Sequence, residues 1–224
     1  RLDRYIDLCA DGVITKQELM ERRKGLDEQI AELQSQYESI EQEDERSGSI
    51  DMKLISQPLD FMGQNIYNGY YVRAGADGEP EFVDRAPGFP KTGSDWPVTP
   101  EAFYYGIKFL TERYPLPLYI TENGMSCHDL VSSDGRVHDP NRITFLDSYI
   151  GAMQKAYDEG ANVAGYFLWT FLDNFEWADG YKQRFGIVYV DFASQRRIVK
   201  DSAFWYQKII ETNGRMLTMN QTTK

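Results

Sequence analysis

Short apolar runs alternate with amphipathic helical segments from residue 59 onward, and this alternation constrains the fold more than any other feature. Strand-like runs are expected over residues 59–67, 116–121 and 163–170. Helices with an apolar stripe follow them, with expected starts at Thr99-Pro100, Asp139-Pro140 and Ser202. Apolar strands that alternate with helices imply a parallel sheet covered by helices. The sequence therefore predicts an α/β fold.

A change of composition near residues 46–49 divides the chain. The part before it is charged, has no proline and has only Gly12 and Gly25. The part after it holds all nine prolines and short apolar runs separated by turn residues. We therefore expect one segment over residues 1–46 and a second over residues 47–224.

The first segment has the pattern of a helical hairpin or a short coiled coil. Asp11-Gly12 marks a turn, and Thr15 with Glu18 forms a capping box at the start of a long helix. Heptad spacing along that helix relates Leu26, Ile30, Leu33, Tyr37 and Ile40. Because the stripe covers only about two heptads, a packed hairpin and a coiled coil both fit it.

Residues 7–18 also partly match a calcium-binding EF-hand loop, with Asp7 first and Glu18 last. Cys9 occupies the third ligand position, however, and a thiol is a poor ligand for a hard cation. The pattern favours an ordinary helix–turn–helix, and no metal site is predicted. Residues 1–40 also resemble the helical tail of serine recombinases, which implies an interaction segment and not a DNA reader.

Charge and cysteine content exclude several classes of partner. The formal net charge of −11 argues against a nucleic-acid-binding surface. No run of about 18 apolar residues predicts a membrane span, and no secretory leader is visible. Cys9 and Cys127 do not form a disulfide framework, which favours a reducing, cytoplasmic compartment. No cofactor is predicted.

Glu122 is the first candidate for chemistry. It follows the run Leu118–Thr121, so it is expected at the carboxyl end of a buried strand, and Asn123-Gly124 lets the chain turn away. In α/β folds that end of the sheet is where ligands and catalytic groups meet. The residues leave two interpretations open: a nucleophile or general base, or a structural partner for a cation.

A second candidate cluster is the run from Trp169 to Trp177, which interleaves carboxylates with aromatic rings. Proteins bind sugars this way, because carboxylates accept hydrogen bonds from hydroxyls while ring faces cover C–H patches. The alternative is a core tryptophan beside capping acids. Two tryptophans, Glu176 and Phe185 in one window favour the sugar interpretation.

Three motifs resemble the C-terminal part of family-one glycoside hydrolases, the β-glucosidase type, over residues of about 50–216. They are the sequences DFMGQNIY at 60–67, YITENG at 119–124 and WTFLDNFEW at 169–177, in the family's order. The resemblance implies a (β/α)8 TIM barrel in which these motifs lie on the sixth, seventh and eighth strands. The chain is then a partial barrel of about the last three strand–helix units.

The resemblance also implies a retaining mechanism. Glu122 would attack the anomeric carbon, Tyr67 would orient that carboxylate by a hydrogen bond, and Asn65 would contact the sugar near its 2-hydroxyl. Ile66 stands where the family usually has a second tyrosine, a change that we expect to be tolerated.

The remaining roles concern substrate binding. By resemblance, Glu176 and Trp177 would hold distal hydroxyls, Trp169 and Phe185 would line the sugar platform, and Trp96 would lie on the aglycone side. The expected ligand is a small-molecule sugar or glycoside.

A retaining glycosidase needs a second carboxylate, the acid/base, about 5 Å from the nucleophile. The family carries it in an Asn-Glu-Pro motif, which this sequence lacks. We therefore expect the nucleophile half of a glycosidase site, associated with copies of itself or with a complementing barrel half. The alternatives are a non-catalytic carbohydrate-binding or assembly module, and a helical interaction segment joined to an inert remnant.

Overall fold

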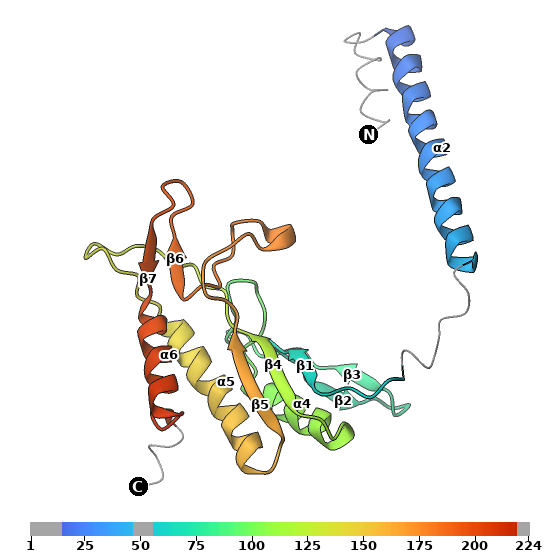
Figure 1. Cartoon of the computed structure of the whole chain (residues 1–224). Helices are drawn as coiled ribbons and strands as arrows, with labels where there is room; N and C mark the ends of the chain where they lie inside the picture. The colour runs from blue at the N-terminus through green and yellow to red at the C-terminus, as the bar shows by residue number, and fades with distance from the viewer. Residues whose placement is uncertain (1–14, 47–55, 219–224) are drawn as a thin grey trace. The chain divides into compact units, whose positions relative to one another are not determined.

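The computed structural model describes residues 15–46 and 56–218. The chain divides into two compact units, residues 1–58 and residues 59–224, which we describe separately (Figure 1). The segment boundary expected after residue 46 stays a prediction. None of the helices in the described ranges has the length and apolar character needed to cross a membrane.

The N-terminal unit contains one long helix, α2 (Lys16–Arg46). It begins directly after Thr15, where the capping box predicts a helix start. Leu26 is half-buried on this helix, whereas Ile30 and Leu33 are exposed. The predicted first arm of the hairpin and most of the calcium-like loop at residues 7–18 lie outside the described residues.

A three-stranded parallel sheet organises the C-terminal unit. It has the order β1 (Met62–Asn65), β4 (Leu118–Asn123), β5 (Val163–Leu168). Helix α4 (Pro100–Arg113) joins the first two strands, α5 (Pro140–Asp158) joins the second pair, and α6 (Asp201–Thr212) follows (Figure 1). The strand–helix alternation predicts this α/β fold correctly.

Two short hairpins and a 3-10 turn lie outside the three-stranded sheet. An antiparallel hairpin, β2 (Val72–Ala74) with β3 (Pro80–Phe82), precedes α4. A second hairpin, β6 (Val188–Val190) with β7 (Arg197–Val199), and the 3-10 turn η1 (Trp177–Asp179) lie between β5 and α6. Strands of three residues are too short to give a periodic signal, so the sequence pattern did not predict them.

One face of the sheet carries the core. Leu118 and Ile120 of β4 are buried against Phe103 and Ile107 of α4 and against the apolar side of α5. Full burial of each such side chain stabilises the fold by about 1.5–3 kcal/mol. The core therefore fixes the sheet to α4 and α5.

The opposite face of the sheet is open in the C-terminal unit. Phe61, just before β1, and Phe167 on β5 are 56% and 57% exposed. Between them lies Tyr119, whose ring meets the edge of Phe61 at 5.4 Å between centroids. Gly165 lies beside Tyr119, since a methyl group there would approach that ring to 2.8 Å. Aromatic side chains thus line a face on which Phe61 and Phe167 stay exposed among the described residues of this unit.

Two helix starts differ in detail from the prediction. Thr99 and Asp139 precede α4 and α5, but neither side chain caps its helix. The Thr99 hydroxyl instead accepts the N–H of Gly69 at 3.0 Å. Asp139 binds Ser202 and Arg142, so both side chains make long-range contacts in place of local caps.

Candidate active site

The Tyr67 hydroxyl donates a 2.6 Å hydrogen bond to the carboxylate of Glu122. Glu122 lies at the carboxyl end of β4, as expected, although the strand extends to Asn123, two residues beyond the expected end at residue 121. Tyr67 lies two residues beyond the end of β1. Asn65 of β1 is in register with Glu122, and the N–H of Ile66 donates to the Glu122 carbonyl at 3.0 Å. The two motifs therefore meet at one edge of the sheet, as predicted.

An irregularity in β4 decides which way Glu122 points. In strict alternation, residue 122 would share the buried helix-packed face with Ile120. The register with β1 and β5 shifts at this point, and Asn123 becomes the buried residue. Its amide donates to the Ile66 carbonyl at 2.8 Å and accepts from the Tyr166 hydroxyl at 2.8 Å. Glu122 is consequently half-buried and accessible to Tyr67.

Tyr67 is held in its neutral form. Burial of the phenol raises the pKa of Tyr67 far above its usual range, and the hydrogen bond to Glu122 and the negative charges of Glu122 and Glu176 add to the shift. Because it stays protonated, its O–H remains a donor toward the carboxylate. Asn65, for its part, accepts the Thr121 hydroxyl at 2.7 Å, beside Glu122.

Trp169 and Glu176 lie together on the chain that follows β5. The indole N–H of Trp169 is 3.3 Å from a Glu176 carboxylate oxygen, which also lies 3.4 Å from the Asn174 amide. The backbone N–H of Trp169 donates to the Asn123 carbonyl at 2.8 Å. This contact fixes the start of the Trp169–Trp177 run to the end of β4.

Gly124 permits this close approach. A methyl group on Gly124 would lie 1.7 Å from the Trp169 carbonyl oxygen. Only a residue without Cβ fits there, so the turn that follows Glu122 is fixed by the neighbouring strand's backbone.

Phe185 and Trp96 complete an aromatic cluster around Tyr67. Phe185 is 3% exposed, and its ring centroid lies 6.4 Å from that of Tyr67 and 6.0 Å from that of Trp96. The Trp96 ring meets Tyr67 edge-on at 5.2 Å. Trp177, by contrast, is 84% exposed and makes none of these ring contacts. The structure thus brings Phe185 to the predicted site and leaves Trp177 at the surface.

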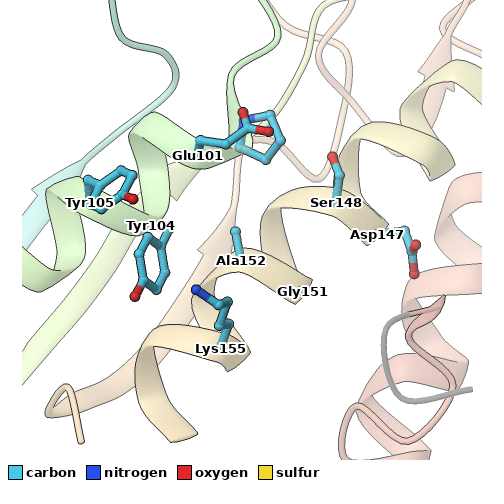
Figure 2. A pocket seen from close by; sticks show the side chains of 9 residues that line it. Glu101, Tyr104, Tyr105, Asp147, Ser148, Gly151, Ala152 and Lys155 are labelled. Carbon is cyan, nitrogen blue, oxygen red and sulfur yellow. The ribbon is translucent and has the colours of Figure 1, made fainter. Parts of the chain in front are cut away.

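Two cavities lie near the sheet. One of about 380 Å³ lies between α4 and α5, where Tyr104 and Lys155 point toward one another with 3.9 Å from the ammonium to the ring centroid (Figure 2). No predicted site residue lines it. Another, of about 1130 Å³, is lined by Tyr70, by residues 82–89, by Lys91 and by residues 95–97, with Trp96 in its wall. Within the described ranges, no group of three His, Cys, Asp or Glu side chains could hold a metal ion.

A buried ionic network behind the site was not predicted from the sequence. It joins three carboxylates to three cations: Asp129, Asp139 and Asp173 with Arg142, Arg184 and Lys200. Arg142 is held charged, since its carboxylate partners raise its pKa against the opposing effect of burial. Burial lowers the pKa of the Lys200 ammonium. The available sequence signal was the position of Asp139, Arg142 and Lys200 at the starts of α5 and α6.

A carboxylate that is oriented by a tyrosine within an aromatic cluster, at the carboxyl end of a parallel sheet, is typical of enzymes that act on sugars. The chain belongs to Glycosyl hydrolase family 1, whose model matches residues 23–215. This match begins inside α2, earlier than the start near residue 50 that the motifs indicate. The match therefore places the chain in a family of glycosyl hydrolases.

Several β-glucosidases are similar to the chain. Beta-glucosidase A of Thermotoga maritima is 49% identical over 167 residues, which cover 73% of this chain and 37% of the relative. Beta-glucosidase A of Acetivibrio thermocellus is 39% identical over 168 residues, 73% of this chain and 38% of the relative. The solved structure of the Thermotoga maritima β-glucosidase with glucoimidazole matches 73% of this chain and 37% of its own, with a TM-score of 0.67 and 50% identity. The chain thus spans a little more than a third of these relatives.

Proposed function

We propose that this chain carries the nucleophile half of a retaining β-glycosidase site that acts on β-linked glucosides. The observation that supports this most directly is the 2.6 Å hydrogen bond between the Tyr67 hydroxyl and Glu122. A neutral donor on one oxygen fixes the carboxylate plane and leaves the other oxygen available to react.

In the proposed first step, the free Glu122 oxygen forms a bond to the anomeric carbon while the bond from that carbon to the aglycone oxygen breaks. The leaving oxygen takes up the electron pair and needs a proton unless it is a weak base. In the second step, water attacks the anomeric carbon and gives one proton to a base, the role that the acid/base carboxylate takes in this step. The glycosyl ester breaks, and Glu122 returns as a carboxylate.

The proposed sugar contacts come from both sides of Glu122. Asn65 lies beside it on β1, near the position proposed for the 2-hydroxyl. Trp169 offers a ring face and Glu176 offers carboxylate acceptors, while buried Phe185 supports the platform from beneath through Tyr67 and Trp96. Trp177 is 84% exposed and would hold a distal hydroxyl together with its neighbour Glu176. The Thermotoga maritima relative binds glucoimidazole, which supports a glucoside as the substrate here.

The missing proton donor must come from outside the described residues, and we propose a complementing polypeptide of the same family as its source. The outer edges of β1 and β5 pair with no other strand among the described residues. Such edges, next to exposed Phe61 and Phe167, are suited to accept further strands. A second copy of this chain would add another nucleophile half without the acid. The stripe that includes Ile30 and Leu33 is a further candidate contact between chains.

A fluorosugar with a dinitrophenolate leaving group tests the nucleophile alone, because that leaving group needs no proton. We expect a covalent adduct on the peptide that contains Glu122, detected by mass spectrometry, and none in Glu122→Gln. An adduct on another residue, or an unmodified wild-type chain, would contradict the proposed nucleophile.

A non-catalytic carbohydrate-binding module is the second candidate, since no Asn-Glu-Pro motif occurs in the sequence while the Trp169–Glu176 pair is intact. It would bind glucoimidazole in a calorimeter and leave the fluorosugar unreacted. The two experiments together separate the two functions.

A further inference from the structure

Asp173 lies in the middle of the Trp169–Trp177 run, and its carboxylate has no place in the site described above. Its side chain is fully buried. One oxygen accepts the N–H of Gly186 at 3.0 Å and the Lys200 ammonium at 2.8 Å. The other accepts Arg184 at 2.5 Å and the N–H of Val190 at 3.3 Å. A buried carboxylate that accepts hydrogen bonds from four donors fixes the segments of the protein that carry those donors.

Two of the donors are the immediate neighbours of Phe185. Asp173 holds the Arg184 side chain on one side and the Gly186 backbone on the other. The approach is close, because a methyl group on Gly186 would lie 2.2 Å from the Asp173 backbone nitrogen. The N–H of Thr170 also donates to the Phe185 carbonyl at 3.2 Å. The backbone at Phe185 is therefore clamped from both directions.

Phe185 connects this fixed backbone to the candidate nucleophile, Glu122. Its ring packs against Tyr67 and Trp96, and Tyr67 donates to Glu122. We propose that Asp173 is a positioning residue, which fixes Phe185 and thereby keeps Tyr67 and Trp96 in place at Glu122. The chemical consequence rests on the proposed function, whereas the positioning of the aromatic cluster does not.

The negative charge of Asp173, as well as the shape of its side chain, is needed to hold Arg184 and Lys200 in place. Lys200 is fully buried and shared between Asp173 and Asp129, which it meets at 2.6 Å. Asparagine at position 173 would leave one Lys200 contact and one Arg184 contact without a counter-charge. Loss of one partner from a buried pair is strongly destabilising, so a matched control must remove the same kind of charge elsewhere.

Asp129→Asn is that control. The Asp129 side chain is 3% exposed and binds Lys200 and Arg142, and it reaches the neighbours of Phe185 through these cations, since Arg142 donates to the Arg184 carbonyl at 2.8 Å. The first readout is the ¹⁹F resonance of Trp96 in protein labelled with 5-fluorotryptophan, assigned among the four tryptophans by Trp96→Phe. We expect Asp173→Asn to shift or broaden this resonance clearly more than Asp129→Asn does at an equal loss of melting temperature, because Asp173 binds both neighbours of Phe185 directly.

The second readout is the rate of fluorosugar labelling at Glu122. We expect a fall of about ten- to a hundredfold in Asp173→Asn, the scale of a catalytic group displaced by a fraction of an ångström, and less than about twofold in Asp129→Asn. Phe185→Leu keeps the ionic network and should reproduce both effects, which also covers the case in which Asp173→Asn fails to fold.

The outcomes are separable. An unmoved Trp96 resonance in Asp173→Asn or Phe185→Leu, or an equal shift in Asp129→Asn, overturns the positioning role. If the wild-type chain is not labelled while the resonance moves as expected, the proposed function fails and the positioning role stands.

Discussion

Gly124 and Trp169 approach so closely that a single methyl group on the glycine would lie 1.7 Å from the Trp169 carbonyl oxygen. The turn after the candidate nucleophile and the first residue of the aromatic run are thus in direct backbone contact. Each part of the site constrains the other before any side chain is considered.

Gly124→Ala should destabilise the fold by more than about 2 kcal/mol, because backbone atoms of Trp169 would have to move. Gly106→Ala is the matched control, since Gly106 lies inside α4 with nothing within 4 Å of the added methyl. It should stabilise by about 0.5–1 kcal/mol through helix propensity. Urea denaturation measures both, and equal effects would refute the steric argument.

Glu122→Gln should lower the labelling rate by at least about a thousandfold, because an amide oxygen cannot act as the nucleophile. Glu101→Gln removes the same charge from α4 and should label like the wild type. Single-turnover release of dinitrophenolate gives the rates. Retention within about tenfold in Glu122→Gln would exclude Glu122 as nucleophile.

Tyr67→Phe should lower the labelling rate by about ten- to a hundredfold and also change the alkaline stability. The pKa of Tyr67 is raised in the folded state, so the stability linked to it is present below the unfolded value of 10.0 and declines as pH rises above it. Between pH 9 and about 11, the free energy of unfolding should therefore fall less in Tyr67→Phe than in the wild type. An identical pH dependence in the two proteins would contradict the buried, neutral phenol.

Phe167→Asp should weaken association with the N-terminal part of the Thermotoga maritima relative, cut where its match to this chain begins. The aspartate would place a charge on the open sheet face. Tyr157→Asp, on α5 and equally exposed at 56%, should associate normally. Sedimentation reports the complex, and turnover of an aryl glucoside reports a completed site.

For that experiment, a wild-type chain that forms only dimers with itself would argue against the complementing partner. Association without turnover would leave the docking face supported and would count against the acid/base arrangement proposed for the complex.

The sequence predicted the three strands of the sheet and the helices between them, because each has a periodic apolar pattern long enough to recognise. The motifs that contain Tyr67 and Glu122 also led us to expect these two residues close together. Their hydrogen bond is consistent with that expectation, while the catalytic roles remain proposals.

Contacts across the fold were beyond the sequence pattern. The hydrogen bond between Asp173 and Lys200 joins residues 27 apart in the sequence, and that between Asp129 and Lys200 joins residues 71 apart. Local spacing in the sequence therefore does not predict either contact. Trp177 was placed in the site by motif alone, yet its ring is exposed to solvent.

Because the register shifts at the end of β4, the position of a residue along this strand determines whether its side chain points toward Tyr67 or into the buried layer. Glu122 and Asn123 are neighbours in the chain. Glu122 faces Tyr67 because Asn123 takes the buried position, where its amide donates to the Ile66 carbonyl. Deleting one residue between Leu118 and Thr121 would move Asn123 into the position of Glu122 and Gly124 into the buried position, placing an amide at Tyr67 and the carboxylate at the exposed position of Thr121. A frame-preserving loss of one codon there would therefore silence the site more thoroughly than most substitutions in its wall.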